Sequence, residues 1–211
     1  EPIAYEQTKA QSRPTDGVAE REQAQADNLM RRVFSARPQE RVLIYVGHSH
    51  VAESPLASSS GESTEWMAAR LKRMTGVDPL TIDQTGVTDR STSMRPVYEA
   101  ATSRIGSKPA VFFDGAKALV LGQYAGSVDL QVVHPRRSYR FGRPTWLVEL
   151  GGKQVPIPRH LLLVEGRRLV QVFAADAPGD AVPLDQVLLD VGSSPSTFII
   201  PEGKVRFTTQ P

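Results

Sequence analysis

The chain has 211 residues, of which 40% are hydrophobic and 23% are charged, and it has no cysteine. This composition is typical of a soluble globular protein, and the lack of cysteine excludes disulfide scaffolds, Cys-ligated zinc, iron–sulfur clusters and thiol nucleophiles. The net charge of +2 is too small to indicate a nucleic-acid-binding protein, and no apolar run reaches the roughly 18 residues that a membrane span needs.

Helices and strands alternate in the first half of the sequence, after an arm at residues 1–15 that we expect to be flexible. Apolar residues at helical spacing predict a helix over residues 18–34. The continuous β-rich run at 41–46, which stops at Gly47, predicts a strand buried on both faces. Further along we predict a helix at 63–75 capped by Gly76, a strand at 79–82, a helix at 96–103 and a strand at 110–113. Residues 16–115 are therefore predicted to form an α/β region, a parallel or mixed sheet with flanking helices.

Hairpin patterns replace helical patterns after Gly115. Short β-rich runs separated by glycine-containing turns predict hairpins at residues 147–157, 161–173 and 197–208. We therefore predict that residues 116–211 form an antiparallel β module.

The loop after the run at 41–46 carries two imidazoles and a carboxylate, in the order His48, His50 and Glu53. In open α/β sheets, ligands collect at the carboxyl ends of the strands. Nitrogen and oxygen ligands of this kind suit zinc, manganese or iron. The loop therefore predicts a divalent-metal site with these three residues as ligands. The alternative is that they are surface residues or a hydrogen-bonded loop clip.

Two other places carry candidate substrate-binding residues. Asp83 and Gln84 follow the strand at 79–82, which in a parallel sheet would end beside the histidine loop. The alternative is that Asp83 begins the next loop. Trp146 lies in an aromatic and basic stretch that suits binding of sugars or phosphates, and the alternative is a core aromatic beside surface charge.

The helix carrying Arg21-Glu22, followed by the strand that runs into Gly47-His48-Ser49-His50, resembles the last part of the ChaN/TraB/erythromycin-esterase-like superfamily. In that group an Arg-Asp/Glu helix precedes a strand that ends in Gly-x-x-His, and the resemblance covers residues 18–85. It implies an α/β fold with a pocket over the strand ends, in proteins that hydrolyse esters or peptides or that bind haem. It also implies that His50 is the functional histidine and that Arg21 and Glu22 face the pocket.

One motif of that superfamily, Gly-Glu-x-His near its N-terminus, is missing, because Gly61-Glu62-Ser63-Thr64 has no histidine. The chain also begins Glu1-Pro2, without an initiator methionine, so we expect a processed or truncated product of a longer protein. Either the missing half of the site was removed with the upstream residues, or the chain is a divergent or inactive relative. We expect export to the periplasm or the medium, with the cytoplasm as the alternative.

The sequence thus predicts a metal-dependent hydrolase acting on an ester or amide bond of a small molecule or peptide. In this hypothesis His50, with His48 and Glu53, holds a metal or acts as a general base. The alternative is a protein without catalytic activity that binds haem, a metal or a cell-surface polymer.

Overall fold

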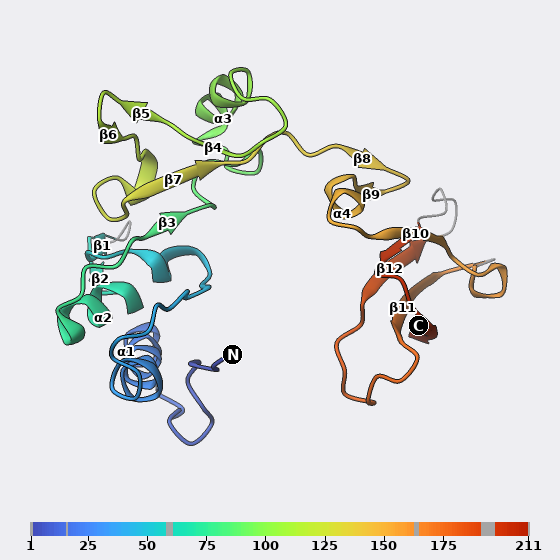
Figure 1. The fold of residues 1–211 in the computed structure, drawn as a ribbon, viewed down its shortest axis with the longest axis horizontal. Coiled ribbons are helices and arrows are strands. Elements are labelled where there is room, and N and C mark those ends of the chain that lie inside the picture. The colour runs from blue at the N-terminus through green and yellow to red at the C-terminus, as the bar shows by residue number, and fades with distance from the viewer. Residues whose placement is uncertain (1, 16, 58–60, 163–164, 191–196, 211) are drawn as a thin grey trace. The chain divides into compact units, whose positions relative to one another are not determined.

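The computed structural model describes residues 2–15, 17–57, 61–162, 165–190 and 197–210. It divides into two compact units, residues 1–136 and 137–211 (Figure 1). Helices and strands are mixed, as predicted, and the strands form several small antiparallel sheets and one mixed sheet. Within the described ranges, no helix has both the length and the apolar character that crossing a bilayer requires.

Two helices form the core of the first part of unit one. Helix α1 (Val18–Leu29) continues as the π-helix η1 (Met30–Phe34), and helix α2 (Met67–Thr75) ends at Gly76, which takes the predicted left-handed conformation with φ of 69°. The apolar positions of α1 and η1 are buried against α2, so the helical spacing seen in the sequence marks a real core face. Its buried members are Ala26, Leu29, Val33, Met67 and Leu71.

A three-stranded mixed sheet forms the rest of unit one. Its strands are β3 (Ile82–Asp83), β7 (Leu130–Val133) and β4 (Ala110–Val111), with β3 parallel and β4 antiparallel to the central β7. Helix α3 (Arg95–Thr102) packs on this sheet through Tyr98 and Ala101. The smaller elements are β1 (Leu56–Ala57) paired with β2 (Ser63–Thr64), β5 (Phe113–Asp114) paired with β6 (Lys117–Ala118), and the short helices η2 (His48–Val51) and η3 (Gly122–Tyr124).

The run at 41–46 is extended but is not a strand, so the prediction of a strand buried on both faces is wrong. Only one face is covered: Ile44 and Val46 pack on the core of α1 and α2, whereas Leu43 is 96% exposed and Tyr45 is 88% exposed. A strand needs a neighbour to satisfy its backbone groups, and the described part of the chain pairs no strand with this run.

Unit two consists mainly of antiparallel strands. Strand β11 (Arg167–Ala174) is paired on one side with β12 (Asp185–Asp190) and on the other with β14 (Val205–Gln210). Strand β10 (Lys153–Pro156) pairs with β13 (Thr197–Ile200), and β8 (Tyr139–Arg140) pairs with β9 (Arg143–Pro144). The inward faces of β11 and β13 meet in a core that includes Val170, Val172 and Phe198. Two short helices, α4 (Trp146–Glu149) and η4 (Arg159–Leu161), complete the unit.

The strand content of this unit was predicted, but its pairings were not. The predicted hairpin at 147–157 is wrong because α4 takes up its first arm, and the Gly152 N–H closes the helical turn by donating to the Leu147 carbonyl at 3.0 Å. The predicted hairpin at 197–208 is wrong because β13 and β14 pair with different strands.

The hairpin at 161–173 is also corrected: Leu161 lies in η4, and the partners of β11 are β12 and β14. Residues 163 and 164 of that prediction lie outside the described residues.

The predictions of the boundary between the units and of a flexible N-terminal arm also change. The boundary between the units falls at 136/137 and not near residue 115, because β7 is the central strand of the sheet in unit one. The N-terminal arm is tied to α1: the Asn28 amide donates to the backbone carbonyls of Tyr5 at 3.1 Å and Glu6 at 3.0 Å.

The boundary between the units predicts where a protease cuts first. Arg136 and Arg137 are both exposed at the boundary, so we expect brief trypsin treatment to cleave there and to release two resistant fragments. Mass spectrometry of the products measures the outcome, with the double variant Arg136→Gln/Arg137→Gln as control. A resistant fragment that ends near residue 115 would contradict the division.

Candidate functional site

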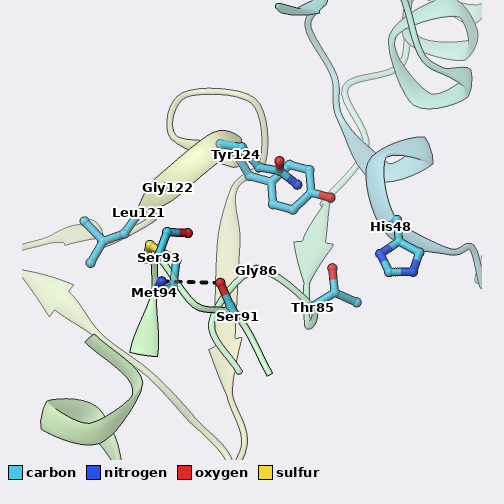
Figure 2. A pocket seen from close by; sticks show the side chains of 10 residues that line it. His48, Thr85, Gly86, Ser91, Ser93, Met94, Leu121, Gly122 and Tyr124 are labelled. Carbon is cyan, nitrogen blue, oxygen red and sulfur yellow. Dashed lines mark hydrogen bonds between the residues drawn. The ribbon is translucent and has the colours of Figure 1, made fainter. Parts of the chain in front are cut away.

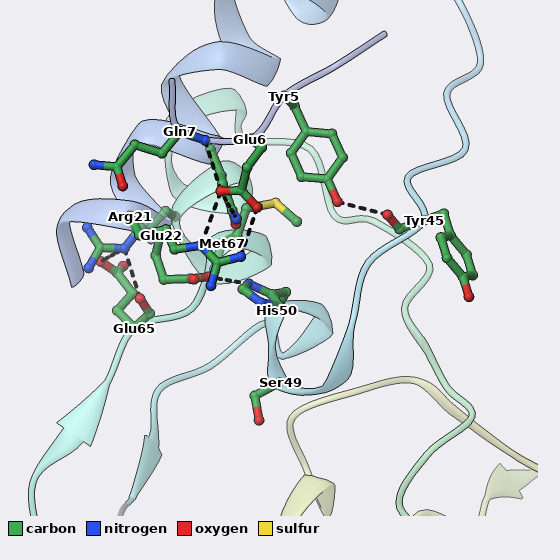
Figure 3. A network of polar contacts seen from close by, with 12 residues as sticks. Tyr5, Glu6, Gln7, Arg21, Glu22, Tyr45, Ser49, His50, Glu65 and Met67 are labelled. Carbon is green, nitrogen blue, oxygen red and sulfur yellow. Dashed lines mark hydrogen bonds and ion pairs between the residues drawn. The ribbon is translucent and has the colours of Figure 1, made fainter. Parts of the chain in front are cut away.

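The structure brings together one pair of predicted catalytic residues, His50 on η2 and Glu22 on α1. The His50 Nδ1 atom lies 2.8 Å from Glu22 Oε2 (Figure 3). The Glu22 side chain is fully buried. In a neutral imidazole, a buried carboxylate that accepts a hydrogen bond from Nδ1 keeps the proton on that nitrogen and leaves Nε2 with a free lone pair. The arrangement is therefore that of an oriented histidine base.

Helix α2 supplies the second donor to Glu22. The backbone N–H of Met67, the first residue of α2, donates to the same Oε2 atom at 2.9 Å. The first N–H groups of a helix have no partner within the helix and favour a negative charge. The other carboxylate oxygen, Oε1, is buried and has no hydrogen-bond partner among the residues that the structure describes. The Glu22 carboxylate is thus held through Oε2, and Oε1 forms no hydrogen bond with the described residues.

Trp66, directly before α2, packs against the same histidine. The two rings meet edge to face, with centroids 5.4 Å apart and planes at 80°. This contact and the bond to Glu22 restrict the ring from two sides, which holds Nε2 in one direction.

Arg21, the neighbour of Glu22 on α1, is turned to the N-terminal arm. Its Nη2 atom lies 2.8 Å from Glu6 Oε2, and the Gln25 amide donates to Glu6 Oε1 at 2.9 Å (Figure 3). The hydrogen bond from Arg21, supported by that from Gln25, lowers the pKa of Glu6 to about 2. Of the two helix residues that the resemblance implies, only Glu22 contacts His50.

Glu53 belongs to a different contact. Its Oε2 accepts from Lys72 Nζ at 2.7 Å, and its Oε1 accepts from the Thr81 hydroxyl. Glu53 therefore links its loop to α2 and to the residue before β3 and is not directed at His50.

The predicted metal ligands His48, His50 and Glu53 consequently do not converge. His50 is turned to Glu22, Glu53 is bound by Lys72 and Thr81, and His48 lines a separate cavity. No group of three or more His, Asp or Glu side chains within the described ranges could hold a metal ion. These residues do not fit the predicted zinc, manganese or iron site.

The cavity that His48 lines has a volume of about 190 Å³ (Figure 2). Pockets for drug-sized molecules usually have roughly 300–1,000 Å³. This cavity is thus too small for haem.

Asp83, which is almost completely buried, holds the loop of Thr85 and Gly86 that lines this cavity. Its carboxylate accepts from the backbone N–H groups of Thr85 at 2.8 Å and Gly86 at 3.0 Å, and from the Gln131 amide at 2.9 Å. Asp83 therefore organises the loop after β3, which agrees with the alternative interpretation from the sequence. Gln84 is turned to the exposed surface, where its Oε1 lies 2.9 Å from His134 Nε2.

Sequence reasoning missed Tyr124, a buried residue of η3 whose hydroxyl lies 3.3 Å from the Ser49 hydroxyl. The only signal in its neighbourhood is the glycine at 122. Trp146, the remaining predicted substrate-binding residue, is 46% exposed on α4 in unit two. The histidine pair belongs to the other unit.

Comparison of the chain with protein-family models, with curated proteins and with solved structures finds no match. The geometry of the described residues therefore carries the functional argument.

The hydrogen bonds of Asp83 to Gly86 and Gln131 predict that any side chain at position 86 lowers the stability of the fold. A Cβ atom on Gly86 would lie 2.6 Å from Asp83 Oδ2 and 3.0 Å from Gln131 Nε2, so Gly86→Ala should lower the free energy of unfolding by about 1–3 kcal/mol. Urea denaturation measures the change. Gly106→Ala is the matched control, because a Cβ there meets nothing within 4 Å. Equal stability of the two variants would contradict this network.

The Glu6–Arg21 contact predicts a pH effect. The pKa of Glu6 is about 2 in the folded chain, below the ordinary 4.5, so its stabilising contribution is present above pH 4.5 and is lost as the pH falls towards 2. Both side chains are about half exposed, so we expect a small effect that salt weakens. Thermal unfolding of Glu6→Gln between pH 2 and 5 should show a shallower pH dependence than Glu99→Gln. The prediction fails if the two variants show the same slope.

Proposed function

We propose that the chain is a hydrolase domain in which Glu22 and His50 form a general-base pair that acts on an ester or amide bond. The observation that carries the proposal is the 2.8 Å contact between His50 Nδ1 and the fully buried Glu22. The same orientation of a histidine by a buried carboxylate is used by hydrolases of unrelated folds.

The pair would activate a water molecule. As the water oxygen bonds to the carbonyl carbon, one water proton passes to His50 Nε2, and the resulting imidazolium is stabilised by the Glu22 carboxylate. The carbon–oxygen or carbon–nitrogen bond then breaks, and His50 returns the proton to the leaving alcohol or amine. Burial strengthens the attraction between imidazolium and carboxylate, since the local dielectric constant is lower than that of water.

Three further features support the proposal. The residues in contact are those that the resemblance implies, Glu22 of the Arg-Glu helix and His50 of Gly-x-x-His, although they lie far apart in the sequence. Glu22 Oε1 has no hydrogen-bond partner among the described residues, so the carboxylate is held through the oxygen that His50 contacts. Trp66 gives the imidazole a fixed orientation.

No step of this mechanism uses a metal, because the predicted ligands do not converge. The proposed site belongs to the first unit, residues 1–136, and a unit of mainly antiparallel strands follows it. We also propose that the protein is exported.

Removal of either member of the pair tests the proposal. With p-nitrophenyl acetate and the corresponding anilide as probes, we expect His50→Gln and Glu22→Gln to lower kcat/KM by about 10²–10⁴-fold, the usual contribution of general-base catalysis. Glu22→Gln keeps an acceptor for the Met67 N–H, so the variant should still fold, which its thermal unfolding checks. His160→Gln, an exposed histidine in unit two, is the matched control.

Two results would contradict the proposal: a parent chain that cleaves neither probe, or a His50→Gln variant with full activity. Loss of activity with a chelator, restored by zinc, manganese or iron, would support the metal-dependent hypothesis in its place. A folded parent chain without hydrolysis would favour the binding protein that the sequence also suggested.

A further inference from the structure

The cavity beside His48 has a lining rich in hydroxyl groups. Thr85, Ser91, Ser93 and Tyr124 all line it, and they come from the loop after β3, the residues before α3, and η3 (Figure 2). Hydroxyl groups from these segments thus line one cavity. A hydroxyl has one donor and two acceptor sites, so such a lining matches a ligand that both donates and accepts hydrogen bonds.

The internal hydrogen bonds of these hydroxyls leave part of that capacity free. Thr85 Oγ1 donates to Asp83 Oδ1 at 3.0 Å and keeps its acceptor sites. Ser91 Oγ accepts from the backbone N–H of Met94 at 3.3 Å and keeps its donor. The cavity therefore offers fixed acceptors and fixed donors in the same wall.

The lining has no permanently charged side chain. None of the described lining residues is Lys, Arg, Asp or Glu. A charged ligand would lose its hydration in this cavity without meeting a permanent opposite charge, which disfavours phosphates and carboxylates. Met94 and Leu121 add an apolar side, which suits the C–H face of a ring.

His48 has an unusual backbone conformation. Its φ is +42°, in the left-handed region that residues other than glycine rarely adopt. Such strained residues are concentrated at ligand-binding and catalytic sites. The strained backbone places the imidazole at the edge of the cavity (Figure 2).

Hydrogen bonds and close packing define the cavity walls. Asp83 fixes the loop at Thr85 and Gly86 by three hydrogen bonds to backbone and side chain. On the opposite side Gly122 has a φ of 74°, and a Cβ atom there would lie 3.2 Å from Met94 Sδ. A preformed site loses less conformational entropy on binding.

The cavity and the histidine pair share one structural element. His48 and His50 lie on the same short helix η2, and the hydroxyl of the intervening Ser49 lies 3.3 Å from the hydroxyl of Tyr124, which lines the cavity. A molecule in the cavity would therefore contact the turn that also positions the proposed base.

We propose that this cavity binds an uncharged, hydroxyl-rich molecule about the size of one sugar ring. The volume of about 190 Å³, the hydroxyl lining and the lack of charged side chains all favour this class of ligand. That the ligand is the hydroxylated part of the substrate rests on the proposed function. The binding itself does not.

Saturation-transfer NMR on the intact chain tests the proposal. The probes are the methyl glycosides of glucose, galactose and N-acetylglucosamine, with glucose 6-phosphate and glucuronate as charged counterparts. We expect transfer to at least one neutral glycoside, and at least 10-fold weaker binding of it by two variants. Ser93→Trp fills the cavity from an exposed position, and His48→Asn removes the imidazole with a residue that tolerates positive φ.

Matched controls separate binding from folding and from catalysis. Ser107→Trp places the same bulk at an exposed position outside the cavity, and His160→Asn removes an exposed histidine, so both should bind as the parent does. His50→Gln should retain glycoside binding while hydrolysis is lost. If hydrolysis of the ester probes is never seen but a neutral glycoside binds, the proposed function fails and the ligand assignment stands.

Three results would overturn the ligand assignment. These are the absence of transfer to every neutral glycoside, unchanged binding by Ser93→Trp, and stronger binding of glucose 6-phosphate or glucuronate than of the neutral probes.

Discussion

The buried carboxylate of Glu22 is the constraint on which the organisation of the first unit depends. A carboxylate without solvent exposure is costly unless donors surround it. Here the donors come from two other segments, the first N–H of α2 and the imidazole of His50. Satisfying one charge therefore joins α1, η2 and α2, and the apolar contacts of Leu29 and Met67 fill the space around that junction. The carboxylate proposed for catalysis also holds these three elements together. Glu22→Gln keeps the size of the side chain and an acceptor oxygen, so it disturbs the fold less than truncation of the side chain would.

Residues of the turn at 48–51 contact two different parts of the first unit. His50 is directed to α1, His48 lines the cavity, and Ser49 contacts Tyr124 between them. The loop and sheet beyond the cavity are held by a second buried carboxylate, Asp83, which binds backbone N–H groups and the Gln131 amide. One buried acid thus holds the turn through a histidine, and the other holds the loop that forms part of the cavity wall. This accounts for a preformed site in a region with few long strands.

Local patterns predicted the elements whose stability is local, and failed where pairing depends on distant residues. The helical spacing of Ala26, Leu29 and Val33 and the capping glycine at 76 suffice to specify α1 and the end of α2. Strand pairing has no such local determinant: β10 pairs with β13 across more than forty residues, and the run at 41–46 has no partner in the described chain. Glu22 and His50 were named as candidates, but their contact was not foreseen, since nothing near either residue encodes the distance between α1 and η2.

The helical geometry of η2 explains why the two histidines do not act together. In a 3₁₀ helix each residue advances by about 120°, so side chains two positions apart lie on different faces. In an extended loop, by contrast, residues two apart point the same way and could share a metal. An extended backbone at 48–50 would have let the two histidines share a metal, whereas the structure forms a tight turn there, with Ala52 N–H donating to the Ser49 carbonyl at 2.9 Å. The turn directs the proposed base to one face and the proposed ligand contact to the other, and the Glu53 carboxylate binds Lys72 and Thr81.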